Sequence, residues 1–299
     1  MPGLTKRYTT AIRTSALLTA ATTLLACTAT PPRYEATSPD VPYPAVAQLE
    51  PGTPVQVVSY GPDALQYAEL WLPEQADAVP VVAFIHGGCW LNAYDIAHTR
   101  PFTTALADAG FAVWSIEYRR TGDAGGGWPG SYEDIQAALA MLAKQQNPQL
   151  DLSRVALLGH SAGGHLALLA GTNAPAQLDV DAVIGLAAIT DLPAYARGDN
   201  SCESVTAAFM GGLPDAIPAL YQQANPAAQQ AHPQTILIHG RADKIVSAEQ
   251  AQLEGATTVW VEDAGHFDMI HPGAPVWQQI VDVLEKSLQE EAAKKEADK

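Results

Sequence analysis

Apolar and polar positions follow one another along the chain in a pattern that predicts strands separated by helices. Near-continuous apolar runs have the length and composition of strands buried on both faces of a sheet. We predict such strands at 79–85, 111–118, 155–158, 181–187, 234–238 and 257–261. Helical spacing predicts helices at 98–110, 131–146, 162–170, 247–254 and 275–289. This alternation predicts an α/β fold whose sheet is mostly parallel, with right-handed crossovers.

The regions around this core are expected to complete one domain at 54–290. Two β-rich runs, 54–60 and 66–72, flank a Gly-Pro-Asp turn and predict an antiparallel hairpin at the sheet edge. We therefore expect eight strands with helices on both faces. Residues 194–233 lack a strand pattern and are predicted to form a small cap over the site. The charged tail at 291–299 is expected to be a frayed extension of the last helix.

The first residues have the composition of an export signal. Three basic residues precede an apolar and small-residue segment at 16–26, which is too short to span a bilayer. The segment ends in Leu-Leu-Ala-Cys, which is similar to a bacterial lipoprotein signal. We expect residues 1–26 to be removed and Cys27 to carry lipid that anchors the protein in the cell envelope. An ordinary secretory signal is the alternative. Residues 27–53, rich in Pro, Thr, Ala and Ser, are predicted to form a flexible tether.

Composition and charge restrict the possible partners. The chain has 299 residues, 47% of them hydrophobic, and a formal net charge of -16, which suits one large globular domain. Loss of the predicted signal removes three positive charges and no acids, and so takes the charge to -19. A surface this acidic repels nucleic acid, so we expect no nucleic-acid partner. The oligomeric state stays open.

A G-x-S-x-G pattern at 159–163 is the strongest chemical signal in the sequence. It follows a predicted buried strand and precedes a predicted helix, the context in which this pattern presents a nucleophilic serine. Ser161 would then lie at a helix N-terminus, which favours developing negative charge. No Gly-Lys-Ser/Thr follows, which excludes a phosphate loop. His160 and His165 are expected to be packing residues.

Other candidates also follow predicted strands, where the active groups of parallel sheets gather. Residues 86–90, His-Gly-Gly-Cys-Trp, predict a loop whose backbone N–H groups can face a ligand. Asp243 and His266 each follow a later strand, and Asp191 and His271 are their rivals. We favour Asp243, within His-Gly-x-x-Asp, and His266, which follows a glycine. No pair has zinc-ligand spacing beside an acid, so neither a metal nor another cofactor is expected.

With these motifs on residues 54–290, the sequence resembles the α/β-hydrolase family. The motifs at 86–90 and 159–164 resemble the branch that contains hormone-sensitive-lipase-like esterases, acetyl-xylan and feruloyl esterases, and kynurenine formamidases. The resemblance implies that Ser161 is the nucleophile, His266 the general base and Asp243 its acid partner. The implied oxyanion hole is formed by the N–H groups of Gly88, Cys89 and Ala162. Trp90 is expected either in the substrate pocket or in the core.

Two cysteines remain if Cys27 is lipidated, and an exported protein encounters an oxidising compartment. We hypothesise a Cys89–Cys202 disulfide between the loop at 86–90 and the cap, with two separate thiols as the alternative.

These inferences predict an exported serine hydrolase that cleaves small carboxylic esters through an acyl-enzyme. Three alternatives stay open: hydrolysis of formamides or peptides by the same triad, a non-catalytic surface binding protein on a hydrolase scaffold, and a true lipase. A lipase needs a large apolar patch around the cap, which the composition of 194–233 does not suggest.

Overall fold

The computed structural model describes residues 1–3, 5, 33–74 and 77–297. The chain divides into two units, Met1–Pro32 and Arg33–Lys299, and the fold below is that of the second. The predicted signal at 1–26 lies outside the described residues except at its first few positions, and Cys27 lies outside them entirely. None of the helices in the described ranges is long and apolar enough to cross a bilayer.

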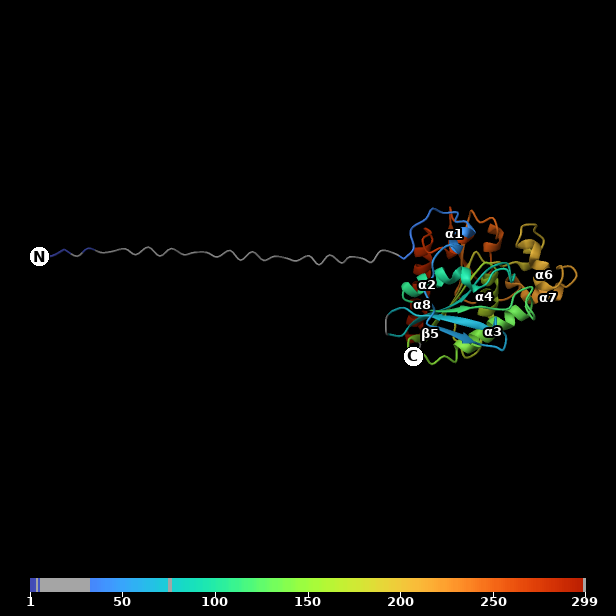
Figure 1. The fold of residues 1–299 in the computed structure, drawn as a ribbon, viewed down its shortest axis with the longest axis horizontal. Coiled ribbons are helices and arrows are strands. Elements are labelled where there is room, and N and C mark those ends of the chain that lie inside the picture. Colours follow the sequence, from blue (N-terminus) through green and yellow to red (C-terminus); the bar gives the residue numbers. More distant parts are fainter. Residues whose placement is uncertain (4, 6–32, 75–76, 298–299) are drawn as a thin grey trace. The chain divides into compact units, whose positions relative to one another are not determined.

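Eight strands form one sheet in the described part of the chain (Figure 1). Their order is β1-β2-β4-β3-β5-β6-β7-β8. The pairs β1–β2 and β2–β4 are antiparallel, and the other pairs are parallel. The predicted eight-stranded, mostly parallel sheet with an edge hairpin is therefore confirmed. The strands are β1 (Gln56–Ser59), β2 (Tyr67–Trp71), β3 (Val79–Ile85), β4 (Ala112–Ile116), β5 (Leu150–His160), β6 (Ala182–Leu186), β7 (Thr235–Gly240) and β8 (Thr257–Val261).

Helices cover both faces of this sheet, as the alternating pattern predicts. They are α1 (Tyr43–Ala47), α2 (Arg100–Asp108), α3 (Gly130–Leu142), α4 (Ala162–Thr172), α5 (Leu192–Tyr195), α6 (Thr206–Met210), α7 (Pro218–Ala224) and α8 (Trp277–Ala297). Short 3₁₀ helices are η1 (Ile96–Thr99), η2 (Glu203–Val205), η3 (Pro226–Ala228), η4 (Ala248–Ala251) and η5 (Phe267–Ile270). Between β6 and β7, where the sequence predicts the cap, the short elements α5 to η3 replace a single crossover helix.

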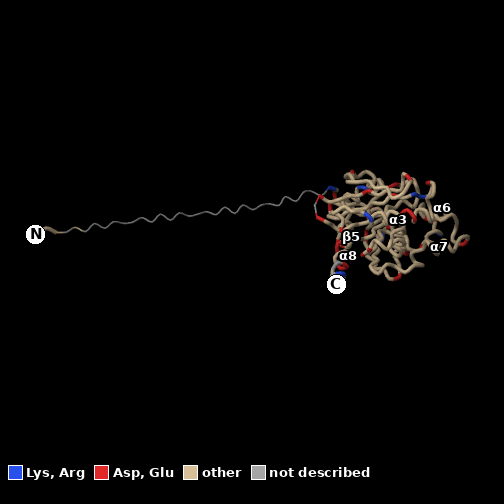
Figure 2. Tube along the Cα trace, turned by 90° about the horizontal axis from the view of Figure 1, so that it is seen from below, with Lys and Arg blue, Asp and Glu red and all other residues tan. Residues whose placement is uncertain are grey.

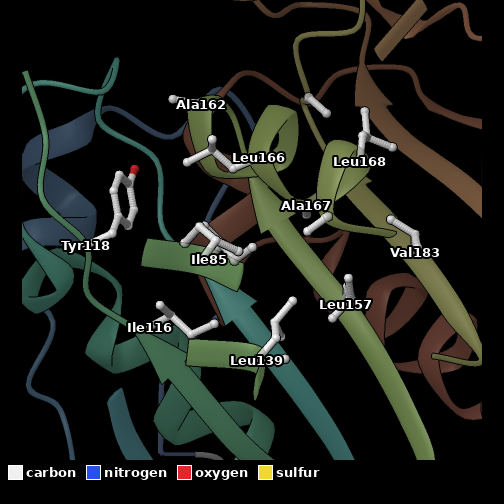
Figure 3. Packing of buried hydrophobic residues seen from close by; sticks show 14 of the residues in the cluster. Ile85, Ile116, Tyr118, Leu139, Leu157, Ala162, Leu166, Ala167, Leu168 and Val183 are labelled. Atoms are coloured by element: carbon white, nitrogen blue, oxygen red, sulfur yellow. The ribbon is translucent and has the colours of Figure 1, made fainter. Parts of the chain in front are cut away.

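Strand β3 shows why the strand runs are continuously apolar. Its alternate side chains enter two different cores, and all of those from Val81 to Ile85 are fully buried. Ile85 packs with Leu139 of α3 and Leu166 of α4 on one face (Figure 3). Phe84, on the other face, belongs to the core shared with α2 and α8. Because neither face meets water between Val81 and Ile85, these positions do not favour a polar residue.

The flexible tether predicted at 27–53 is wrong for residues 33–53, the part of it that the structure describes. Residues 34–49, which we call the N-terminal arm, pack on the domain and contain α1. Val41 and Val46 are buried, and the Val41 N–H donates a hydrogen bond to Asp268 Oδ2 at 2.9 Å. The Pro- and Thr-rich composition indicated a linker, but the few apolar side chains of the arm are enough to dock it on the histidine side of the domain.

The tail at 291–299 also differs from the prediction. Helix α8 continues to Ala297 as a regular helix. Lys295 Nζ lies 2.6 Å from Asp181 Oδ1 and 2.8 Å from Asp179 Oδ2. Because the carboxylate of Asp181 is buried, a paired cation is favoured there, and this pairing holds the last turns against the domain.

Charged residues in this unit are distributed over many elements, as Figure 2 shows. Several arginines are paired with carboxylates: Arg100 with Glu69 and Arg119 with Asp134 each at 2.6 Å. Such pairing reduces the positive potential that these side chains offer to an anionic partner.

Candidate active site

The serine turn joins β5 to α4 and holds Ser161 in a strained backbone conformation. Its φ of 55° and ψ of -121° are rare for a residue with a side chain and cost about 1–3 kcal/mol. A Cβ on Gly159 would collide with the carbonyl oxygen of Gly163, and a Cβ on Gly163 would collide with that of Ile85. The two glycines of the pattern therefore let strand, turn and helix pack closely enough to present the serine.

The loop after β3 approaches this serine with an equally unusual backbone. Gly88, Cys89 and Trp90 have φ values of 109°, 54° and 57°. A Cβ on Gly87 would lie 3.1 Å from the Cβ of Ser161, so the loop rests directly against the serine turn. The structure thus gathers the predicted oxyanion donors: Gly88 and Cys89 line a cavity with Ser161, and Ala162 is the first residue of α4.

His266 and Asp243 form the second half of the site. His266 Nδ1 donates to Asp243 Oδ2 at 2.7 Å, and Oδ1 of the same carboxylate accepts the N–H groups of Ile245 and Val246 at 2.8 and 2.9 Å. Burial opposes ionisation of Asp243, but the charge and hydrogen bond of His266, with these N–H groups, lower the pKa of its carboxyl. With Nδ1 donating, Nε2 of His266 is the nitrogen free to accept a proton.

The rival residues have structural roles elsewhere. Asp191 caps α5, where its Oδ1 accepts the Ala194 N–H at 3.0 Å. His271 Nδ1 accepts the Gly273 N–H at 3.1 Å. His266 is hydrogen-bonded to Asp243 and not to Asp191, and His271 does not line the cavity that contains Ser161. The structure therefore brings together Ser161, Asp243 and His266, and leaves both rivals out.

His160 and His165, on either side of the serine turn, are buried packing residues. His160 Nε2 donates to the carbonyl oxygen of His266 at 3.1 Å, and the two rings lie 4.6 Å apart. Burial, reinforced by repulsion from His266, holds the pKa of His160 well below its ordinary value. His165 Nε2 donates to the carbonyl oxygen of Ala224 in the cap at 2.7 Å, and burial lowers the pKa of His165 to about 4.

Ser161 and His266 face a shared cavity of about 240 Å³. No hydrogen bond between these two described side chains is present. The aromatic rings of Tyr43, Tyr94 and Phe267 form one side of the cavity, and its other lining includes the cap residues Ser201 and Cys202 with Ile245. In the described ranges, no group of three or more His, Cys, Asp or Glu side chains is placed to bind a metal ion.

The aromatic side of this cavity was missed by sequence reasoning. Tyr43 belongs to α1 in the arm, and its ring lies 5.7 Å from that of Tyr94 and 5.4 Å from that of Phe267. Asp268 was missed as well: its Oδ2 accepts the N–H groups of both Gly265 and Val41 at 2.9 Å. Its position two residues after His266 was the available signal, whereas the tether-like composition around Tyr43 gave none.

Of the two placements left open for Trp90, the structure supports the core and not the substrate pocket. Trp90 is fully buried, stacks on Phe209 with ring centroids 4.7 Å apart and does not line the cavity. A left-handed backbone at this position turns the indole under the cap, where it meets His165 edge-on.

Cys89 and Cys202 form a disulfide with a Cα–Cα distance of 5.1 Å, and both line the cavity. The bond connects the loop after β3 to the start of η2 in the cap. It closes a segment of 113 residues that contains the serine turn.

A buried polar cluster also supports the loop after β3, and its acid, Glu117, was not identified from the sequence. The ring of His86 lies 3.1 Å from Glu117 Oε1 through Nε2 and 2.8 Å from the Gly87 carbonyl oxygen through Nδ1. Burial opposes ionisation of Glu117, but the His86 ring and its hydrogen bond, with Arg120 and the Ile96 N–H, lower the pKa of this carboxyl. A buried and well-paired polar cluster of this kind favours one loop conformation.

A model of the BD-FAE family matches residues 68–255, which include the loop after β3, the serine turn and Asp243. The chain belongs to the BD-FAE family. Among curated proteins, this BD-FAE chain is 29% identical to "Esterase LipC" of Mycobacterium tuberculosis over 240 residues, 73% of the chain and 58% of LipC. It is 33% identical to non-reducing polyketide synthase ausA of Aspergillus calidoustus over 46% of the chain and 6% of the synthase. The chain thus spans less than two thirds of the length of these relatives.

Solved structures show the same fold. Esterase B from Lactobacillus rhamnosis superposes with a TM-score of 0.70 at 21% identity, over 85% of this chain and 93% of that one. A truncated carbohydrate esterase from gut microbiota gives 0.66 at 23% identity, over 80% and 97%. A bifunctional GH43-CE protein from Bacteroides eggerthii gives 0.63 at 26% identity, over 77% of this chain and 37% of that one. The BD-FAE chain therefore has the α/β-hydrolase fold that the sequence predicts.

Proposed function

We propose that this protein is a serine hydrolase that cleaves small carboxylic esters through an acyl-enzyme. The observation that carries the proposal is the His266–Asp243 hydrogen bond of 2.7 Å beside a cavity that also contains Ser161. A serine hydroxyl is a weak nucleophile at neutral pH unless a base lies within reach. Support comes from Ser161 and His266, which line one cavity although far apart in the sequence, and from Asp243, which is hydrogen-bonded to His266.

In the acylation step, Ser161 Oγ attacks the ester carbonyl carbon while His266 Nε2 removes the hydroxyl proton. Asp243 stabilises the resulting imidazolium through Nδ1. Apo enzymes often hold the serine and the base slightly apart until substrate binds, and Ser161 and His266 line the same cavity. The imidazolium then protonates the leaving alcohol, and the same base activates water to release the acid.

The oxyanion of the tetrahedral intermediate would be held by the N–H groups of Gly88, Cys89 and Ala162. Their support is the left-handed backbone of the loop after β3 and the start of α4 beside Ser161. One such donor typically contributes about 3 kcal/mol to transition-state stabilisation. Here each donor belongs to a backbone that neighbouring glycines and packing hold in place, so little reorganisation is needed during the reaction.

Esters are favoured over formamides and peptides as the substrate class. The support is the similarity to an esterase and to a carbohydrate esterase. A cavity of about 240 Å³ suits a small acyl or alcohol group. A panel of acetyl, butyryl, feruloyl and formamide substrates tests this choice, and preferential turnover of the formamide would contradict it.

Replacement of the nucleophile tests the mechanism. We expect Ser161→Ala to keep the fold and the thermal unfolding midpoint but to lose nearly all turnover of short p-nitrophenyl esters. The loss should be on the order of 10⁴-fold or more in kcat. Comparable turnover in this variant would overturn the proposed mechanism.

Export and lipid anchoring are also part of the proposal. They rest on the sequence of residues 1–27 and agree with the Cys89–Cys202 disulfide, since disulfides persist in oxidising compartments. Mass spectrometry of the mature N-terminus should find diacylglycerol and acyl groups on Cys27. An unmodified Cys27, or cleavage at another position, would contradict the anchor.

A further inference from the structure

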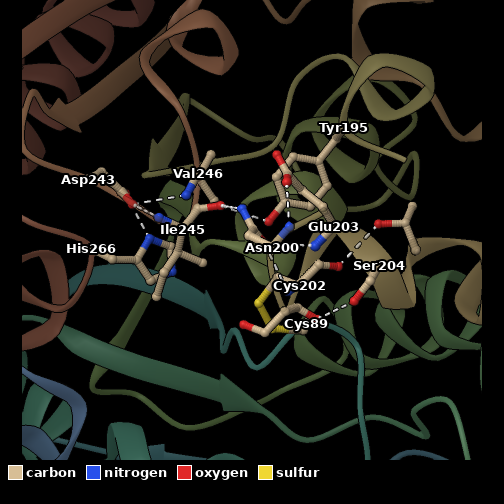
Figure 4. The surroundings of a disulfide bond; sticks show 12 residues. Cys89, Tyr195, Asn200, Cys202, Glu203, Ser204, Asp243, Ile245, Val246 and His266 are labelled. Atoms are coloured by element: carbon tan, nitrogen blue, oxygen red, sulfur yellow. Dashed lines mark hydrogen bonds and ion pairs between the residues drawn. A yellow bond between two sulfur atoms is a disulfide. The ribbon is translucent and has the colours of Figure 1, made fainter. Parts of the chain in front are cut away.

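The start of the cap lies between the two catalytic loops and contacts both of them (Figure 4). On one side the Cys202 sulfur is bonded to Cys89 in the loop after β3. On the other side Asn200 reaches the loop that carries Asp243. We call Asn200, Cys202 and Cys89 the cap junction.

The cap junction helps to position the carboxylate of Asp243. Asp243 Oδ1 accepts the N–H of Val246 at 2.9 Å. The carbonyl oxygen of the same peptide unit, that of Ile245, accepts Asn200 Nδ2 at 2.9 Å and the Tyr195 hydroxyl at 3.1 Å. Two cap side chains therefore hold the peptide that orients the carboxylate. Tilting this peptide would move the acceptor of His266 Nδ1.

The same asparagine holds the cysteine. Asn200 Oδ1 accepts the N–H groups of Cys202 and Glu203 at 2.9 and 3.0 Å, and the Asn200 N–H donates to Glu203 Oε2 at 3.0 Å. Both ends of the Asn200 side chain are thus used, one toward the disulfide and one toward the acid loop. Cys202 is buried and is bonded to Cys89. A shift of Cys202 would therefore also move Cys89.

We propose that Asn200 is a positioning residue for the catalytic acid, and that the Cys89–Cys202 disulfide extends this hold to the oxyanion loop. Full activity then requires an intact, oxidised cap junction. This inference rests on the proposed function. Its physical basis is that oxyanion donors and an acid–base pair must be held together within a fraction of an ångström, and misplacement by about 1 Å can cost on the order of 100-fold in rate.

The redox part of the proposal has a defined chemistry. A small dithiol such as dithiothreitol supplies two electrons and two protons, so that Cys89 and Cys202 become thiols and the reductant becomes its cyclic disulfide. Cys89 is only half-buried and both sulfur-bearing residues line the cavity, which gives a small dithiol access. After reduction the Asn200 contacts remain, but the oxyanion loop loses its covalent tie to them.

The test compares kcat and KM for p-nitrophenyl acetate across a pH series in the full chain. The variants are Asn200→Ala, Asn200→Asp and the double variant Cys89→Ser with Cys202→Ser; Ser204→Ala is the control. Asn200→Asp keeps the acceptor for the Cys202 N–H and loses the donor to Ile245, so it isolates the acid-loop contact even if Asn200→Ala fails to fold. Ser204 is an exposed residue of the same segment, and its variant should stay within about twofold of wild type.

We expect both Asn200 variants to lower kcat about tenfold or more with little change in KM. The acidic limb of the Asn200→Ala kcat/KM profile should move to lower pH, because a misplaced carboxylate stabilises the protonated base less. Reduction of the wild type should lower kcat reversibly, and the double cysteine variant should have the lower kcat without further response to dithiothreitol.

Unchanged kcat and pH profile in the folded Asn200 variants would overturn the positioning role, and reduction without effect would overturn the redox part. If the wild type neither turns over esters nor reacts with a fluorophosphonate, the proposed function itself fails and the inference fails with it. An active wild type with unaffected variants refutes only the inference.

Discussion

The serine turn and the histidine loop line the same cavity, but different interactions hold them. Ser161 is fixed by its own backbone, which is left-handed between two tightly packed glycines. His266 has an ordinary helical backbone, with φ -64° and ψ -44°. Its loop is held instead by hydrogen bonds with Asp243, His160 and Asp268.

This difference sets how far each region depends on the rest of the chain. The serine turn is identified by five consecutive residues, and the distant group against which Gly163 packs is the backbone of Ile85 directly beside it. The histidine loop depends on partners at long range: Asp243 lies 23 positions from His266 and His160 lies 106 positions from it, while Asp268 joins the loop to Val41 across 227 positions. Damage to the histidine loop can therefore begin far from the cavity, whereas damage to the serine turn begins beside it.

The largest expected effect comes from removing the base. We expect His266→Ala to lower kcat for a short ester on the order of 10⁴- to 10⁶-fold, because the serine then has no proton acceptor. Its unfolding midpoint should stay near that of wild type. Activity within tenfold of wild type would show that a group outside the histidine loop is the base.

The acid is expected to matter next. Asp243→Asn should lower kcat by roughly 10³- to 10⁴-fold, since an amide stabilises neither the required tautomer nor the imidazolium. Asp191→Asn is the matched control, because it alters the rival acid, which caps α5 outside the cavity. Steady-state kinetics of the two variants identify which acid assists His266. A larger loss of kcat in the Asp191 variant would contradict the role of Asp243.

The steric lock of the serine turn can be tested with two glycines. Gly163→Ala should destabilise the protein by about 3 kcal/mol, because its Cβ has only backbone carbonyls to displace. Gly110→Ala is the control: a Cβ on Gly110 meets nothing within 4 Å, and its positive φ of 101° leaves only about 1 kcal/mol of backbone strain. Equal losses in urea unfolding would show that the turn is not sterically locked.

Sequence reasoning succeeded where a short run of consecutive residues carries the signal. The apolar run of β3 identifies a doubly buried strand, and the glycines at 159 and 163 identify the serine turn, although the contacts of these residues extend to distant parts of the chain. The N-terminal arm and the end of α8 could not be predicted in this way. Val46 and Lys295 are held by partners distant in sequence, and neither lies in a periodic pattern.

Because the histidine loop depends on distant partners, we expect a change at Asp268 to have an effect of intermediate size. Asp268→Ala removes the acceptor of two buried N–H groups and should cost about 2 kcal/mol of stability. We also expect about a tenfold fall in kcat, because the loop that carries His266 is loosened. Asp263→Ala changes an exposed carboxylate of the same loop and should alter neither quantity. If stability fell but kcat did not change, the contact between the N-terminal arm and Asp268 would not contribute to catalysis.

The smallest effect concerns pH and the buried histidine after the serine turn. Burial lowers the pKa of His165 to about 4, so the unfolded chain binds a proton there first as pH falls below about 6.5. Stability should therefore fall between pH 7 and 5, by about 2 kcal/mol for this group. The loss should continue until pH reaches the folded-state pKa. Urea unfolding of wild type and His165→Gln at both pH values measures this, and an identical pH dependence in the two proteins would contradict it.

Acidification affects the acid loop only at a lower pH. The pKa of Asp243 is lowered from 3.8, so its contribution to stability is fully present above that value. The contribution is lost only as pH falls further, through the folded-state pKa. Loss of stability near pH 5 thus reports the buried histidines rather than the acid loop.

The most direct test of the account is covalent labelling with a fluorophosphonate, read by peptide mass spectrometry. The account predicts one labelled peptide in the wild type, with the adduct on Ser161, no adduct in Ser161→Ala and strongly slowed labelling in His266→Ala. An unlabelled wild type, or equal labelling of Ser161→Ala at another residue, would contradict the claim that the two differently held loops meet to activate this serine.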